Sequence, residues 1–154
     1  EYLSKLKVKL CNPNASVPKR GTQYSAGYDL YCCEPITIKP GSVEKVDTGL
    51  KLSIPEGCYG RIASRSSWAL DKIFAEGGVI DRDYTGIIKV LLYNASNEDF
   101  DVIIGDRCAQ IILEKVYCPE VETVKDITDE FCTRKGGFGS TDDDDKLHNT
   151  CFDK

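Results

Sequence analysis

The sequence has 154 residues, of which 41% are hydrophobic and 29% charged, so it suits one globular domain with a buried core. The net charge is −5, and residues 142–146 (DDDDK) alone carry −3 of it, so we expect no nucleic-acid partner. No apolar run approaches the ~20 residues of a membrane span, and the first residues lack a signal-peptide pattern. We therefore expect a soluble intracellular protein, cytoplasmic or nuclear, with no membrane partner.

Short apolar or alternating runs, separated by turn residues, follow one another along the chain. Leu6, Val8 and Leu10 alternate with lysines, which is the period of a half-buried strand. Similar runs predict strands at residues 29–33, 36–38, 43–46, 50–54, 59–63, 87–93, 100–104, 108–114 and 121–124. Residues 66–72 alone indicate a helix, which would be short. This pattern predicts an all-β fold, a jelly-roll-like barrel or sandwich with one short helix.

The cysteines do not suggest a metal site, and the last residues do not suggest a further part of the core. None of the eight cysteines forms a C-x-x-C pair, and the single histidine is His148, so we do not expect a zinc site. Several cysteines fall in apolar runs, where a reduced thiol packs as a small hydrophobe. From about residue 133 glycines and then acidic residues dominate, which predicts a flexible arm followed by a disordered tail.

Residues 77–86 (GGVIDRDYTG) form the densest cluster of chemically interesting residues. One interpretation is an ordinary β-hairpin whose aspartates and glycines serve only the turn. The other is a hairpin whose backbone recognises the edge of a ligand while the carboxylate of Asp81 polarises a water molecule. The segment alone does not decide between them.

Three further segments each allow two interpretations. Arg65, Ser66 and Ser67 precede the short helix and would make either an anion site or an ordinary serine N-cap. In residues 105–110 (GDRCAQ), Asp106 and Arg107 most simply form an ion pair, whereas the Gln110 amide can donate to a phosphate oxygen. Residues 136–141 (GGFGST) suit either a linker or a phosphate cradle with one stacking ring.

Taken together and in order, the segments resemble the five-motif signature of the dUTPase family. They are residues 26–30 (AGYDL), 60–67 (GRIASRSS), 78–86 (GVIDRDYTG), 105–110 (GDRCAQ) and 137–141 (GFGST). The resemblance implies a Mg²⁺-dependent hydrolase that converts dUTP to dUMP and pyrophosphate, keeping uracil out of DNA and supplying dUMP for dTMP synthesis. It also implies a homotrimer of jelly rolls with shared active sites. Residues 1–132 would be the β domain, 133–141 the active-site arm and 142–154 the acidic tail.

The resemblance also assigns roles to residues. Asp81 would be the general base that activates water for attack at the α-phosphate, and Asp29 would reach Mg²⁺ through water, with the ion held mainly by the triphosphate. The uracil edge would pair with the backbone of Gly78, Val79, Ile80 and Lys89, above a deoxyribose packed on Tyr84. The remaining substrate contacts would come from Arg65, Ser66, Ser67, Gln110, Arg134, Phe138, Gly139, Ser140 and Thr141.

The sequence departs from the family pattern at several positions. Ser67 stands where the family usually has glycine, which a serine can replace if the backbone φ is negative. Arg134 lies one residue later than the usual arginine of the fifth motif. Two rival functions share this fold: a dCTP deaminase, and a non-catalytic relative that binds a regulatory partner.

Overall fold

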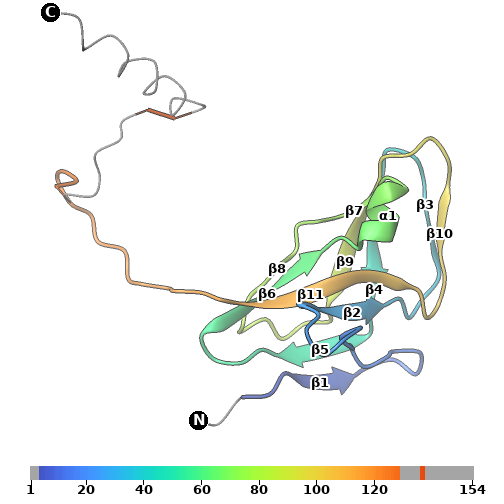
Figure 1. Cartoon of the computed structure of the whole chain (residues 1–154), viewed down its shortest axis with the longest axis horizontal. Helices are drawn as coiled ribbons and strands as arrows, with labels where there is room; N and C mark the ends of the chain where they lie inside the picture. Colours follow the sequence, from blue (N-terminus) through green and yellow to red (C-terminus); the bar gives the residue numbers. More distant parts are fainter. Residues whose placement is uncertain (1–3, 129–135, 138–154) are drawn as a thin grey trace, which may run out of the picture. The chain divides into compact units, whose positions relative to one another are not determined.

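The computed structural model describes residues 4–128 and 136–137 (Figure 1). The chain divides into two units, Glu1–Cys118 and Pro119–Lys154, and the described strands all lie in the first. The strands are β1 (Lys7–Leu10), β2 (Gly27–Tyr31), β3 (Ile36–Ile38), β4 (Val43–Asp47), β5 (Leu50–Ser53), β6 (Cys58–Ala63), β7 (Ile73–Glu76), β8 (Val79–Ile80), β9 (Lys89–Asn94), β10 (Phe100–Val102) and β11 (Arg107–Lys115). The helix is α1 (Ser66–Leu70).

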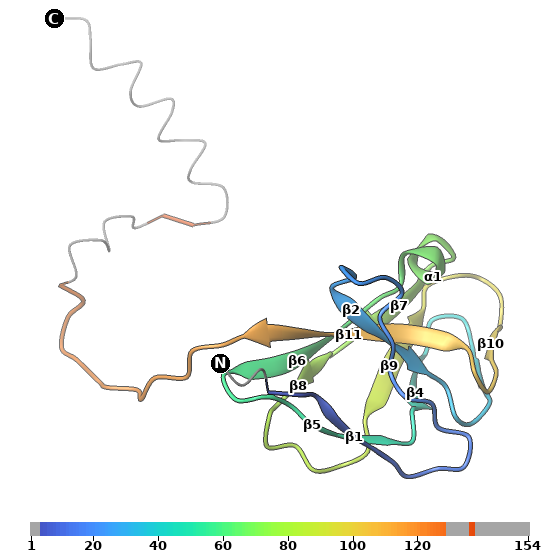
Figure 2. The same cartoon turned by 60° about the horizontal axis from the view of Figure 1, so that its bottom comes forward.

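The strands form small antiparallel sheets. The largest has the order β2-β11-β6-β8, and the next has the order β4-β9-β7. The pairs β1-β5 and β10-β3 complete the first unit. The long strand β11 lies between β2 and β6, which Figures 1 and 2 show from two sides. Through β11, residues far apart in the sequence come onto neighbouring strands.

The core is built from the inward-facing positions of these strands. In β9 the side chains of Val90, Leu92 and Asn94 are buried, while Lys89 is exposed, as strand alternation requires. Leu50 and Ile111 join the same hydrophobic cluster from other sheets. Each fully buried side chain of this size contributes about 1.5–3 kcal/mol of transfer free energy, so the cluster holds the sheets together.

The predicted all-β fold with one short helix is confirmed, although the described strands form separate small sheets and no closed barrel. The strand predicted at 121–124 is wrong. The described residues after Lys115 contain no strand, and Val121 is 97% exposed. A strand needs a hydrogen-bonded neighbour, and no described strand pairs with this segment. Conversely, β7 was not predicted, because four residues ahead of two glycines look like part of a turn.

The helix and the cysteines of the described residues bear on the predictions made for membrane spans and thiols. In the described residues no helix is long and apolar enough to cross a membrane. The cysteines in this part of the chain are all free, and Cys32, Cys33 and Cys108 are buried.

Candidate active site

The strands β7 and β9 form a hairpin that stays paired only as far as Glu76. Beyond this residue the two segments separate, and we call this feature the divided hairpin. β7 pairs with β9 as far as Glu76 opposite Leu91. Gly77 and Gly78 then adopt positive φ (69° and 79°), and the chain crosses to β6, where β8 pairs with that strand instead. A cavity of about 560 Å³ is therefore left beside β8 and β9. It is lined by Lys45, Gly77, Gly78, Val79, Ile80, Asp81, Tyr84, Lys89 and Leu91.

Gly78 is required at this crossing for two reasons. Its positive φ favours glycine, and a Cβ built on it would lie 2.7 Å from the backbone oxygen of Ile62. This close approach lets the N–H of Ile62 donate to the Gly78 carbonyl over 2.7 Å. A side chain at this position would push β8 away from β6 and change the shape of the cavity.

The backbone groups of Val79 and Lys89 point into the space between β8 and β9. The N–H of Thr48 donates to the carbonyl of Ile88, and Asn94 donates to Ser42, so the even-numbered residues of β9 bond towards β4. By antiparallel alternation, Lys89 directs its N–H and carbonyl to the opposite edge, where no described strand pairs with it. Because Gly78 bonds to β6, Val79 likewise turns its backbone away from β6. Two unpaired backbone edges thus line one cavity.

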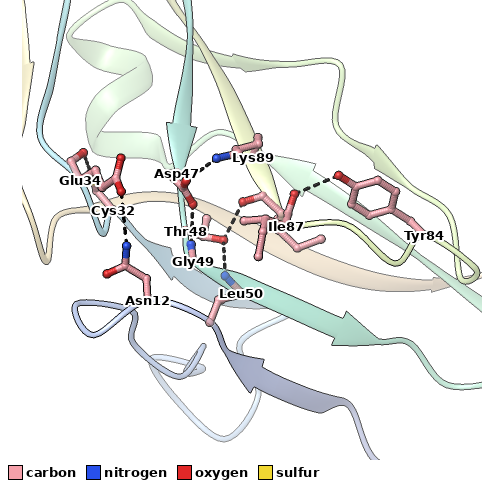
Figure 3. Close-up of polar contacts among 11 residues, drawn as sticks. Asn12, Cys32, Glu34, Asp47, Thr48, Gly49, Leu50, Tyr84, Ile87 and Lys89 are labelled. Carbon is pink, nitrogen blue, oxygen red and sulfur yellow. Dashed lines mark hydrogen bonds and ion pairs between the residues drawn. The ribbon is translucent and has the colours of Figure 1, made fainter.

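A carboxylate and an aromatic ring lie beside these edges. The turn after β8 is closed by the Tyr84 N–H, which donates to the Asp81 carbonyl over 3.1 Å. The Tyr84 hydroxyl donates to the carbonyl of Ile87 over 3.0 Å, which fixes the ring against the chain entering β9 (Figure 3). Asp81 and Tyr84 are both exposed and line the cavity. The sequence therefore places an accessible carboxylate beside the unpaired backbone.

A second polar cluster forms where β2, β11 and the start of α1 meet. Asp29 pairs in register with Gln110, and Gln110 with Ala63. The Asp29 carboxylate lies 3.9 Å from Nε of Arg65 and 3.6 Å from Nη1 of Arg107. Two guanidinium groups and one amide, whose N–H groups can donate to an anion, are thereby gathered around the carboxylate of Asp29.

Further hydrogen bonds order this second cluster. Arg65 Nη1 donates to the carbonyl of Arg107 over 2.9 Å, and Gln110 Nε2 donates to the carbonyl of Ser64 over 3.1 Å. A Cβ on Gly27 would come within 2.2 Å of Gln110 Oε1, so this glycine leaves the room that the amide occupies. Sequence reasoning gave neither Gly27 nor Arg107 a place in the site. Their positions inside two of the motifs were the available signal.

The predicted ion pair between Asp106 and Arg107 is wrong. Asp106 Oδ2 instead accepts a hydrogen bond from the N–H of Ile103 over 3.0 Å, and Arg107 pairs with Asp29. Consecutive residues of an extended chain point to opposite sides, so these two neighbours are directed to different partners.

The predicted serine N-cap of the helix is also wrong. The N-cap is Arg65, with extended backbone, and no side-chain hydrogen bond caps the helix. Ser66 and Ser67 instead occupy the exposed first turn. Lys72, with a φ of 63°, is the only non-glycine residue of positive φ in the described part, so Ser67 replaces the usual glycine without backbone strain. Lys72 also explains why the helix ends at Leu70, before the predicted end at residue 72.

The two clusters lie at different levels of β6. The second cluster lies beside Ala63 of β6. Ile80 pairs with Gly60, so the next residue, Asp81, lies beside Tyr59. Four residues along a strand span about 13 Å. Within one chain, Asp81 is thus displaced along the sheet from the second polar cluster.

The predicted residues Arg134, Phe138, Gly139, Ser140 and Thr141 lie outside the described residues. Within the described ranges, no group of three or more His, Cys, Asp or Glu side chains is arranged to hold a metal ion. A divalent cation would therefore need most of its ligands from a substrate or from water.

Comparison with known proteins gives consistent results. The sequence matches the family model described as dUTPase over residues 13–142. It is 52% identical over 138 residues to the deoxyuridine 5'-triphosphate nucleotidohydrolase of Yarrowia lipolytica, covering 88% of each chain. It is 44% identical over 137 residues to the enzyme of the same name from Saccharomyces cerevisiae, covering 88% of this chain and 93% of the relative.

Solved structures have the same fold. The dUTPase of Staphylococcus bacteriophage 80alpha with dUPNHPP superposes with a TM-score of 0.82 at 26% identity, covering 88% of this chain and 97% of the phage chain. The jelly-roll-like β fold that these structures share supports the predicted fold class.

Proposed function

The chain belongs to the dUTPase family, and from that premise we propose that it hydrolyses dUTP to dUMP and pyrophosphate. The observation that carries the proposal is the divided hairpin, whose cavity combines two unpaired backbone edges, an accessible carboxylate and a fixed aromatic ring. The reaction keeps uracil out of DNA and supplies dUMP for dTMP synthesis, which requires an intracellular location.

The cavity beside β8 and β9 is the base site of the proposed enzyme. In β8 the backbone of Val79, between Gly78 and Ile80, faces the cavity, and together with the backbone of Lys89 on the other side it offers donors and acceptors to the edge of uracil. Cytosine presents an amino group where uracil has a carbonyl, so it mismatches at least one of these groups. Tyr84 lies under the deoxyribose and leaves no room for a 2′-hydroxyl.

Asp81 is the proposed general base. Its carboxylate accepts a proton from a water molecule as the water oxygen forms a bond to the α-phosphorus, and the bond from that phosphorus to the bridging oxygen of pyrophosphate breaks. General-base catalysis of this kind contributes about 10²–10⁴ in rate. The exposure of Asp81 beside the sugar site supports this role.

The second cluster holds the phosphate chain. Arg65 and Gln110 donate to phosphate oxygens, together with the first-turn N–H groups and hydroxyls of Ser66 and Ser67. The exposed guanidinium of Arg107, beside Asp29, adds a positive charge to this cluster. Arg134, Phe138, Gly139, Ser140 and Thr141 close over the nucleotide from the C-terminal arm.

The described residues can bind Mg²⁺ only together with the triphosphate, which would supply most of the ligands of the ion. Asp29 is a single, mostly buried carboxylate between two guanidinium groups, so it can bind one water of a hydrated ion but cannot form a metal cage. When bound, the ion neutralises the charge that develops on the phosphates.

The proposed active form is a homotrimer in which each site takes groups from more than one chain. The displacement between Asp81 and the anion-binding cluster along β6 supports this arrangement. The segment after β11 adds support, because Tyr117, Val121 and Ile127 are 87%, 97% and 66% exposed in one chain. Exposed apolar side chains that gather on one surface are a common feature of contacts between chains.

The proposal is tested by measuring pyrophosphate release from dUTP, dTTP, dCTP and UTP with Mg²⁺. We expect turnover of dUTP alone, and its loss in Asp81→Asn. Asp99→Asn serves as the control, because Asp99 pairs with Lys39 on the surface. Ammonia release from dCTP would instead establish the deaminase, and dUTP binding without turnover would establish the non-catalytic relative.

A further inference from the structure

We propose that Asp47 is a positioning residue for base recognition: it holds Lys89 so that the backbone edge of β9 faces the uracil. The inference rests on the proposed function and deepens it. Asp47 belongs to none of the five motifs, and it lies on β4 behind the edge of β9 that lines the cavity.

The contact between Asp47 and Lys89 is direct. The two residues are register partners on β4 and β9, and Asp47 Oδ2 accepts a hydrogen bond from Lys89 Nζ (Figure 3). Their side chains are 21% and 41% exposed, so the ion pair is partly shielded from water. The ion pair joins β9 to β4 at Lys89, whose backbone pairs with no described strand on the cavity side.

Asp47 is itself held by the turn that follows it. Its Oδ1 accepts the N–H of Gly49 over 2.7 Å, and Gly49 has a φ of 65°. A Cβ on Gly49 would lie 2.7 Å from the Asn12 side chain, so the turn is tightly packed. Burial would raise the pKa of the Asp47 carboxyl, but the hydrogen bonds from Lys89 and Gly49 outweigh burial and lower this pKa. The carboxylate therefore remains charged and fixed in direction.

The residues just before Lys89 are held by the same turn and by Tyr84. The buried Thr48 hydroxyl donates to the carbonyl of Ile88 over 2.7 Å, and the Ile88 N–H donates to the Leu50 carbonyl over 2.8 Å. The Tyr84 hydroxyl holds Ile87. Three successive residues, Ile87, Ile88 and Lys89, thus have polar anchors, and the anchor of Lys89 is the ion pair with Asp47.

This anchoring matters because none of the described strands pairs with β9 on the cavity side at Lys89. A strand end with one free edge opens easily, and each opening would move the N–H and carbonyl that pair with the base. The ion pair keeps those groups in place before the nucleotide arrives, so less ordering is needed on binding. Its loss should weaken base recognition without affecting the attack on phosphorus.

The test compares Asp47→Asn, Lys89→Gln and Lys89→Arg with the wild type. The first two variants should raise KM for dUTP and Kd for dUMP by about threefold to tenfold, with kcat within about twofold. Lys89→Arg keeps the ion pair, so it should lose less affinity for dUMP than Lys89→Gln does. The Kd for inorganic tripolyphosphate, which carries the phosphates without the base, should stay unchanged in all three variants.

Asp99→Asn is the matched control, because it breaks the ion pair of Lys39 and Asp99, neither of which lines the cavity. An unchanged Kd for dUMP in Lys89→Gln would overturn the inference, and so would an equal loss of dUMP and tripolyphosphate binding. Lys89→Gln preserves the contact of Asp47 with Gly49, so it decides the question even if Asp47→Asn folds poorly. Absence of dUTP turnover in the wild type would refute the proposed function instead.

Discussion

Gly86 shows how one residue without a side chain shapes the proposed sugar site. A Cβ on Gly86 would lie 2.4 Å from the Tyr84 hydroxyl, so Gly86→Ala must displace the ring or break its hydrogen bond to Ile87. We predict that KM for dUTP rises by about tenfold, as expected when a hydrogen-bonded positioning contact is lost. Steady-state kinetics with dUTP measure this change.

Gly41→Ala is the matched control for Gly86→Ala. Gly41 has a φ of 74° and open space around its Cβ position, so the alanine costs about 1 kcal/mol of folding free energy through backbone strain alone. Its KM should equal that of the wild type. Equal KM values for both variants would show that Tyr84 does not need its present position.

The buried thiols should be chemically inert in the folded protein. Burial raises the pKa of Cys33 to about 11 and that of Cys108 to about 12. The thiolate is the reactive form, so both remain unreactive at pH 8, whereas Cys11 and Cys118 are exposed. We predict that iodoacetamide labels Cys11 in the native protein, and Cys33 and Cys108 only after unfolding. Peptide mass spectrometry distinguishes the labelled positions, and rapid native labelling of Cys108 would contradict this assignment.

At the scale of elements, the ribbon of β1 and β5 contains an unfavourable pair. Lys9 and Lys51 are directly opposite each other, and like charges in this position destabilise a sheet. We predict that Lys51→Glu raises the free energy of unfolding by about 0.2–1 kcal/mol at low salt, and that added salt reduces the gain. Urea unfolding at two salt concentrations measures both effects.

Lys115→Glu is the control for the charge change itself, because Lys115 lies opposite the neutral Cys58. It should bring no comparable gain. If Lys51→Glu were no more stable than the wild type, the repulsion between Lys9 and Lys51 would be too well screened by water to affect folding.

The elements also show where sequence patterns suffice. Alternation predicted nearly every strand, since inward-facing apolar residues decide which segments pair. It missed β7 and the two-residue β8, whose partners β9 and β6 lie elsewhere in the sequence, and it failed at 121–124, with which no described strand pairs. Strand pairing depends on the tertiary structure, so a prediction from sequence patterns fails most easily for short segments and for segments without a partner strand.

For the molecule as a whole, the motifs predicted the family and supplied most residues of the proposed site, but not how those residues meet. The contact of Arg107 with Asp29 depends on the register of β2 against β11. The cavity depends on β8 leaving β9, which requires the positive φ of Gly77 and Gly78. The anchors formed by Asp47 and Thr48 have no motif to mark them, because a strand end followed by a turn has no distinctive spacing.

The proposed sharing of sites between chains leads to a decisive complementation experiment. Asp81→Asn removes the base, and Arg65→Gln removes a phosphate ligand, so each variant alone should be nearly inactive. If the two residues of one site come from different chains, mixed trimers contain sites with both residues intact. Random assembly of equal amounts yields about a quarter of such sites.

We therefore predict that unfolding and refolding the two variants together restores about a quarter of wild-type dUTP turnover. Refolding each variant separately and then mixing gives the baseline, because preformed trimers exchange chains slowly. Sites built within one chain would recover no activity in any mixture, because every chain lacks one of the two groups. The roughly 13 Å between the levels of Asp81 and Gln110 along β6 makes recovery the expected result.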